Sequence, residues 1–269
     1  MPRQQLDFFS TSASPSESCS SSNDVNQPVK PPSSLEDAEL VAQIPKAGVV
    51  EAPLLAMEAG HRRLTGAISA LEALCQRFAG FGLNRRIPEQ EAALDALAMI
   101  GGRDARQSVT KMILKGAVQG PSLRIAVAAA ARLKIVLPGD MISELLQHDD
   151  GRMRVAACGC VPGDPKVIPF LVACLQDHEL EARKSAACAL GRWGRQEALA
   201  PLTQLLQLAP SVDVIDAVAS VANEDCIILL GRIARTRPDL RDSALETLDA
   251  IDHPTARLLV ERLDGASEQ

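Results

Sequence analysis

The sequence predicts an all-α solenoid, a right-handed stack of helical hairpins that follows a disordered N-terminal tail. Short Ala-rich cores recur along the chain at a nearly constant interval, and a second apolar pattern with helical spacing lies between them. Aromatic residues make up only 2% of the chain. A core without aromatics must be filled by Leu, Ala, Val and Ile, which suits closely packed helices better than sheets. One helical pair repeated at a fixed period is typical of an α-solenoid.

Residues 1–34 form the predicted disordered tail. Ten Ser and five Pro occupy this segment, and aliphatic residues are few. Such a stretch buries too little apolar surface to offset the chain entropy that folding removes. It has neither the apolar core nor the cleavage site of a secretory signal, and no run of the chain is apolar enough to span a bilayer. We therefore expect a cytoplasmic protein without a membrane partner.

Residues 35–87 are expected to form an N-terminal helical cap. Ser34, followed three residues later by Asp37, is a weak capping-box start, and the short helix that it opens should end before Pro45. A longer helix is expected to open at Pro53. Its apolar face would carry Leu64, Ile68, Leu71, Cys75 and Phe78, at spacings of four, three, four and three.

Residues 88–265 contain the repeats. The Ala-rich cores begin at Ala129, Ala156, Ala186, Ala217 and Ala244, which are 27, 30, 31 and 27 residues apart, and an earlier copy begins at Ala92. The patterns between them are Ile142, Leu145 and Leu146, then Val167, Leu171, Cys174 and Leu175, then Leu199, Leu202 and Leu206. Each pattern places one apolar stripe on a helix, so each repeat is predicted to be a helical hairpin.

The repeat over residues 168–191 resembles a HEAT repeat. Pro169 stands early in its first helix, Asp177 at its turn and Arg183 at the start of its second helix, which contains Ala186-Ala-Cys-Ala-Leu-Gly. The period of about 30 residues is similar to that of the short HEAT-like repeats of phycobilisome lyases. The resemblance implies a HEAT-like fold. It does not select an activity, because the family includes scaffolds, transport receptors, lyases and DNA glycosylases.

Two sets of residues are expected to serve the fold. Gly191 and Gly194 should occupy left-handed positions where a helix ends. Arg154, Arg183 and Arg241 follow the turn in three repeats, and Asp149, Asp177 and Asp239 are available to them. In HEAT-like folds such an Arg commonly pairs with an Asp of the turn. The alternative is that these arginines contact a partner.

No catalytic set, cofactor site or metal site is predicted. Seven Cys are present, most of them among Ala, Leu or Ile, which is typical of reduced core thiols. Cys158, Cys160, Cys174 and Cys188 could be read as a metal cluster, but a zinc site normally takes its thiolates from paired knuckles. The four His are far apart in the sequence, and neither a Ser/His/Asp order nor a phosphate-binding loop is present.

Charge is distributed unevenly along the chain. Residues 1–100 carry a net charge of −4, residues 101–195 carry +5 and residues 196–269 carry −7. The basic middle could face an acidic partner or could be an ordinary solvated surface. The candidate partner-binding residues in this part are Arg154, Arg183, Lys184, Arg192, Trp193 and Arg195, with Trp193 as the aromatic candidate.

A short peptide in the tail is a second candidate for partner binding. It consists of Gln5, Leu6, Asp7, Phe8 and Phe9. The peptide resembles the motif by which bacterial replication and repair proteins bind the sliding clamp, although Phe8 stands where Leu is usual. A polar anchor and two adjacent apolar side chains on a flexible tether suit a pocket on a partner.

The sequence thus predicts a non-enzymatic, bacterial-type scaffold or adaptor that binds another protein through its solenoid surface and its tail. Two alternatives follow from the resemblances. One is a lyase-like subunit that acts on a tetrapyrrole or on another cofactor-bearing protein. The other is a DNA-repair accessory factor tethered to the sliding clamp, although the net charge of −6 and the scarcity of aromatics disfavour nucleic acid as a partner.

Overall fold

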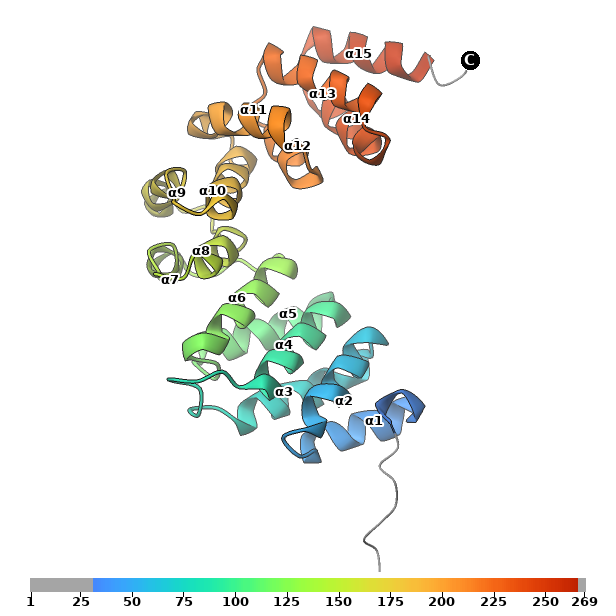
Figure 1. Cartoon of the computed structure of the whole chain (residues 1–269), viewed down its shortest axis with the longest axis vertical. Coiled ribbons are helices and arrows are strands. Elements are labelled where there is room, and N and C mark those ends of the chain that lie inside the picture. Colours follow the sequence, from blue (N-terminus) through green and yellow to red (C-terminus); the bar gives the residue numbers. More distant parts are fainter. Residues whose placement is uncertain (1–30, 266–269) are drawn as a thin grey trace, which may run out of the picture.

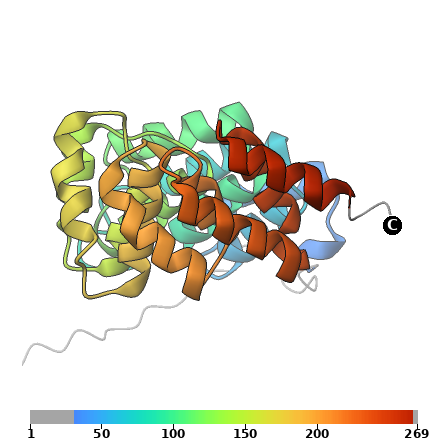
Figure 2. The same ribbon diagram turned by 90° about the horizontal axis from the view of Figure 1, so that it is seen from above.

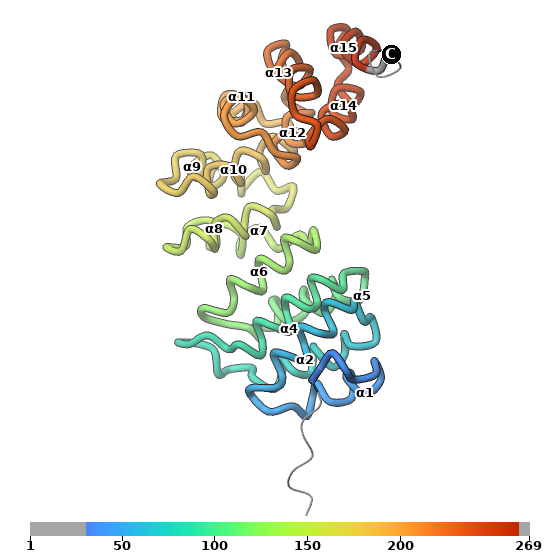
Figure 3. Tube along the Cα trace, turned by 45° about the vertical axis from the view of Figure 1, so that its right-hand side comes forward, coloured from blue at the N-terminus to red at the C-terminus, as the bar shows by residue number. Residues whose placement is uncertain are grey.

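The computed structural model describes residues 31–265, and the tail up to residue 30 and residues 266–269 lie outside the described part. Within it the fold is all-α. The α-helices are α1 (Asp37–Gln43), α2 (Glu51–His61), α3 (Ile68–Arg77), α4 (Pro88–Ile100), α5 (Gly102–Leu114), α6 (Leu123–Arg132), α7 (Gly139–Leu145), α8 (Gly151–Cys158), α9 (Ile168–Cys174), α10 (Leu180–Arg192), α11 (Leu199–Leu208), α12 (Val212–Val218), α13 (Glu224–Thr236), α14 (Arg241–Ala250) and α15 (Pro254–Gly265). They pack in consecutive pairs and form a HEAT-like solenoid that rises from α1 to α15 (Figure 3).

The solenoid has two layers. The even-numbered helices from α2 to α14 pack one on the next and form an inner row, and the odd-numbered helices cover it. The chain bends so that α7 and α9 lie on the outer side of the curve and α8 and α10 on the inner side (Figure 1). Seen from above, the repeat of α9 and α10 projects to one side of the molecule (Figure 2). The inner row therefore lines a concave surface.

The predicted Ala-rich cores all lie on this inner row. Ala93, Ala130, Ala157, Ala186, Ala217 and Ala244 are each completely buried on α4, α6, α8, α10, α12 and α14. Small residues let neighbouring helices approach closely. At Gly60 of α2, for example, an added Cβ would lie only 2.8 Å from the Cα of Ala96 on α4. The apolar patterns between the cores lie on α7, α9 and α11, where Ile142, Leu171 and Leu202 are fully buried. The predicted hairpins are confirmed.

The stack also includes most of the segment expected as a cap. The boundary expected at residue 88 falls between α3 and α4, which pack against each other, and α2 packs extensively on α4. Pro32–Ser34, at the end of the expected tail, form a 3-10 helix. Arg62 holds this turn on α2, since its guanidinium donates to the carbonyls of Pro32 (3.1 Å), Ser33 (3.0 Å) and Leu35 (2.8 Å).

The single long helix expected from Pro53 to Phe78 is wrong. The chain ends α2 at His61 and begins α3 at Ile68. Arg63 adopts a left-handed conformation with φ 52°, and the N–H groups of Arg63 and Leu64 donate to the carbonyls of Gly60 (2.9 Å) and Ala59 (3.0 Å). This is a Schellman ending, which usually has Gly at the left-handed position, so the sequence carried no signal for it.

The two glycines expected at a helix end differ in role. Gly194 has φ 66° and closes α10 as predicted. The prediction is wrong for Gly191, which lies inside α10 with ordinary helical geometry. A Cβ at Gly191 would come within 2.5 Å of both the carbonyl oxygen of Ala217 and a methyl of Leu202. Gly191 is therefore needed for the close approach of α10 to its neighbours.

Candidate functional site

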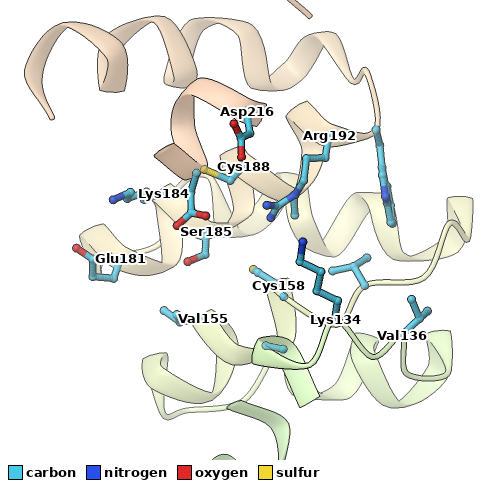
Figure 4. Close-up of a pocket in the computed structure, with 16 residues that line it drawn as sticks. Lys134, Val136, Val155, Cys158, Glu181, Lys184, Ser185, Cys188, Arg192 and Asp216 are labelled. Carbon is cyan, nitrogen blue, oxygen red and sulfur yellow. The ribbon is translucent and has the colours of Figure 1, made fainter. Parts of the chain in front are cut away.

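A groove of about 570 Å³ is hollowed in the concave face across α6, α8, α10 and α12 (Figure 4). Successive inner helices place matching positions on its walls. Glu181 and Lys184 are the second and fifth residues of α10, and Asp213 and Asp216 are the second and fifth residues of α12. Positions three apart lie on one face of a helix, so both members of each pair line the groove.

One end of the groove is basic and partly aromatic. Lys134, just after α6, and Arg192, at the end of α10, line it together with Trp193. Lys134 is in a left-handed conformation with φ 53° and closes α6 in the same way that Gly194 closes α10. Its carbonyl accepts a hydrogen bond of 3.0 Å from Arg106 of α5, which fixes the strained turn.

The floor of the groove is formed by thiols and small residues. Cys158 and Cys188 lie there, 3% exposed each, and Gly159 lets α8 approach α6, because a Cβ at Gly159 would be 2.5 Å from that of Ala131. Burial raises the pKa of Cys188 to about 11 and raises that of Cys158 further. The thiols therefore stay protonated at neutral pH. Like the other cysteines of the described part, they are unpaired and buried, as the sequence predicted for the core.

A second depression of about 660 Å³ adjoins the basic end of the groove. Arg103, Arg106, Gln107 and Thr110 of α5 line it, and the side chain of Val136 is shared by both hollows. Arg103 and Arg106 thereby extend the basic end of the groove onto α5, a helix of the outer layer.

The structure divides the sequence-predicted site residues into two groups. Lys184, Arg192 and Trp193 meet in the groove. Arg154, Arg183 and Arg195 do not line it, and their side chains make contacts within the fold. Arg195, for example, pairs with Glu197 at 2.8 Å.

Arg154 holds two repeats together. It is 7% exposed, and its guanidinium makes a bidentate pair with Asp177 of the next repeat, with N···O distances of 2.6 and 2.8 Å. Its remaining nitrogen donates to the carbonyls of His148 (2.7 Å) and Asp149 (3.0 Å). The expected pairing of this Arg with an Asp of a turn is confirmed for Arg154, whose partner is Asp177 of the next repeat. From Asp149 the guanidinium takes the backbone oxygen.

The other two arginines of the expected ladder also bind backbone. Arg183 donates to the carbonyls of Asp177 (2.6 Å) and His178 (3.2 Å), so it stabilises the turn before α10. Arg241 donates to the carbonyl of Leu263 at 3.0 Å and ties α14 to α15. Asp239, the expected partner of Arg241, is bound by Arg237 in a bidentate pair instead.

The Arg154–Asp177 pair makes stability depend on pH. The guanidinium of Arg154, helped by the N–H of Glu179, lowers the pKa of Asp177 to about 2. An unfolded Asp has a pKa near 4, so the carboxylate stabilises the fold above that pH and loses its contribution as the pH falls toward about 2. We expect wild type to exceed Asp177→Asn in unfolding free energy by on the order of 2 kcal/mol at neutral pH. Denaturant titrations should show this difference shrinking below about pH 4; a constant difference would contradict the assignment.

The sequence analysis missed four of the six charged residues that line the groove. Lys134, Glu181, Asp213 and Asp216 were not singled out. Aligning the inner helices on their first residues would have shown that the second and fifth positions of α10 and α12 are charged and share a face. For Lys134 no such signal exists, because its place depends on a left-handed turn.

Some predictions lie outside the described residues. The tail peptide of Gln5, Leu6, Asp7, Phe8 and Phe9 precedes residue 31, so clamp binding stays a prediction. Between residues 31 and 265, His, Cys, Asp and Glu nowhere gather in a group that could hold a metal ion. In the same range no helix has the length and apolar character that a membrane crossing requires.

Comparison with known proteins identifies the repeats that carry the groove. Residues 140–223, from α7 to α12, match the family model of HEAT repeats. This part of the chain is therefore similar to HEAT repeats. No curated protein sequence matches the chain.

Two solved structures resemble the solenoid. The crystal structure of YibA from Escherichia coli is 13% identical, covers 80% of this chain and 82% of its own, and superposes with a TM-score of 0.51. Human deoxyhypusine hydroxylase in complex with glycerol is 16% identical over 79% of this chain and 84% of its own, with a TM-score of 0.36. At these identities the YibA match supports the HEAT-like fold alone.

Proposed function

We propose that this HEAT-repeat protein is a non-enzymatic scaffold that holds a segment of another protein in the groove across α6, α8, α10 and α12. Stacked helical pairs produce an extended concave surface, and such surfaces are used for protein contacts. The groove lies on three hairpins that match the HEAT model and on the end of α6.

The observation that carries the proposal is the charge of the lining. Small-molecule pockets are mostly apolar with a few convergent polar groups. This groove instead exposes charges of both signs beside an aromatic ring, which suits a partner segment with complementary charges. The charged lining residues are Lys134, Glu181, Lys184, Arg192, Asp213 and Asp216.

Blocking the groove tests the proposal. Ser185 lines its centre, so Ser185→Trp should fill the hollow, and proteins that wild type captures from native extract should no longer bind. Ala173→Trp, on the exposed outer side of α9, is the matched control and should capture the same proteins as wild type. Equal capture by Ser185→Trp, with an unchanged melting temperature, would contradict the proposal.

A further inference from the structure

We propose that the groove recognises an extended partner peptide by two opposite charges, an acidic residue bound between Lys134 and Arg192 and a basic residue bound by Asp213 and Asp216. The inference rests on the proposed function and specifies its ligand. The two charges lie about two residues apart in the peptide.

The basic end lacks a counter-charge within the fold. Lys134 and Arg192 point into the same space in Figure 4, and neither forms an ion pair with another residue of the described part. By contrast, Arg154 and Arg195 nearby are both paired with carboxylates. Two cations that face one another repel, and a carboxylate placed between them removes that repulsion and gains two attractions.

The wall beside these cations is apolar. Trp193 is half-buried there, and Val136 and Val161 line the same end of the groove. Apolar walls exclude water from a bound carboxylate, which strengthens its attraction to both cations. They also offer contact area to an apolar residue next to the acidic one.

An acidic part of the groove adjoins the basic end. Asp213 and Asp216 of α12 line it, and neither is in an ion pair with any residue that the structure describes. Glu181 and Lys184 lie one turn apart on α10 and largely offset each other's charge. The net charge of this part therefore comes from the two aspartates, which suit a Lys or Arg of the partner.

The distance between the two charged groups sets the spacing of the peptide's charges. Asp216 lies beside Cys188 in Figure 4, and Arg192 follows Cys188 by four residues on α10, a rise of about 6 Å at 1.5 Å per residue. An extended chain covers this distance with about two residues at 3.3 Å each.

The backbone at Lys134 favours a role for its side chain. Gly194 occupies the matching left-handed position after α10, where a residue without a Cβ is unstrained. Lys134 keeps the strained conformation and presents its ammonium group to the groove. Lys134→Gly thus removes the charge at a position where Gly suits the backbone.

The test uses the one Trp of the chain, Trp193, as a reporter at the site. The probe is the peptide Glu-Leu-Lys, acetylated and amidated, which should change the emission of Trp193 on binding. Lys134→Gly or Arg192→Gln should weaken binding about tenfold, and Asp216→Asn should also weaken it. Lys166→Gln, an exposed charge remote from the groove, should not.

Probe changes complete the experiment. Replacing the probe's Glu by Gln should weaken binding to wild type but have little further effect with Arg192→Gln, and a probe with Lys in place of Glu should recover binding with Arg192→Glu. No binding by wild type, or equal loss with Lys166→Gln, would overturn the inference. If Ser185→Trp alone abolishes partner capture while Lys134→Gly leaves it intact, the charge inference fails and the proposed function stands.

Discussion

Replacing Arg154 by Ala should lower the free energy of unfolding by about 3–5 kcal/mol. The substitution leaves the carboxylate of Asp177, whose side chain is 6% exposed, without its bidentate partner. It also removes the donor to the carbonyls of His148 and Asp149. A buried charge without a partner is costly, so the effect exceeds the worth of an ordinary surface ion pair.

A double-mutant cycle separates the pair from its parts. Arg154→Met combined with Asp177→Leu removes both charges together, so the double variant should be destabilised much less than the sum of the single variants. Urea denaturation followed by circular dichroism measures each variant. Additive single and double effects would show that the two side chains stabilise the fold independently, contrary to the geometry.

Gly191→Ala should destabilise the protein by about 1–3 kcal/mol, although Ala is normally the better helix former. The new methyl group would meet the backbone oxygen of Ala217 at 2.5 Å, and a backbone atom of α12 cannot move aside without shifting the helix. Gly163→Ala is the matched control, because nothing lies within 4 Å of its added Cβ.

The change in unfolding free energy that Gly191→Ala causes should therefore differ from that of Gly163→Ala in sign or clearly in size. Thermal and urea unfolding measure both changes. Since α10 and α12 both line the groove, Gly191→Ala should also alter the emission of Trp193, while Gly163→Ala should leave it unchanged. A stabilising effect of Gly191→Ala would contradict the close approach of these helices.

The repeats could be predicted because their signals are local. The Ala-rich cores and the apolar stripes repeat with helical spacing, and each belongs to one helix, so the sequence alone locates the hairpins and their buried faces. The burial of individual residues could be predicted too, since Ala186 and Ile142 are both completely buried as expected.

The features that could not be predicted depend on contacts between repeats or on unusual backbone. Arg154 takes its carboxylate from Asp177 of the following repeat, and the sequence left this choice open among the Asp residues of the turns. Arg63 and Lys134 end helices in left-handed conformations without the Gly that usually marks such turns. The position of Lys134 depends on its left-handed turn. The sequence therefore could not predict that Lys134 joins Arg192 at the basic end of the groove.

The two layers differ in stiffness along the solenoid. Inner helices pack continuously from α2 to α14, while close packing between successive outer helices is confined to α3 with α5 and to α11, α13 and α15. A stack held by neighbour contacts bends most easily where those contacts are fewest. We therefore expect the solenoid to bend most easily at its middle repeats. Stretching or compressing the molecule should then change the width of the groove.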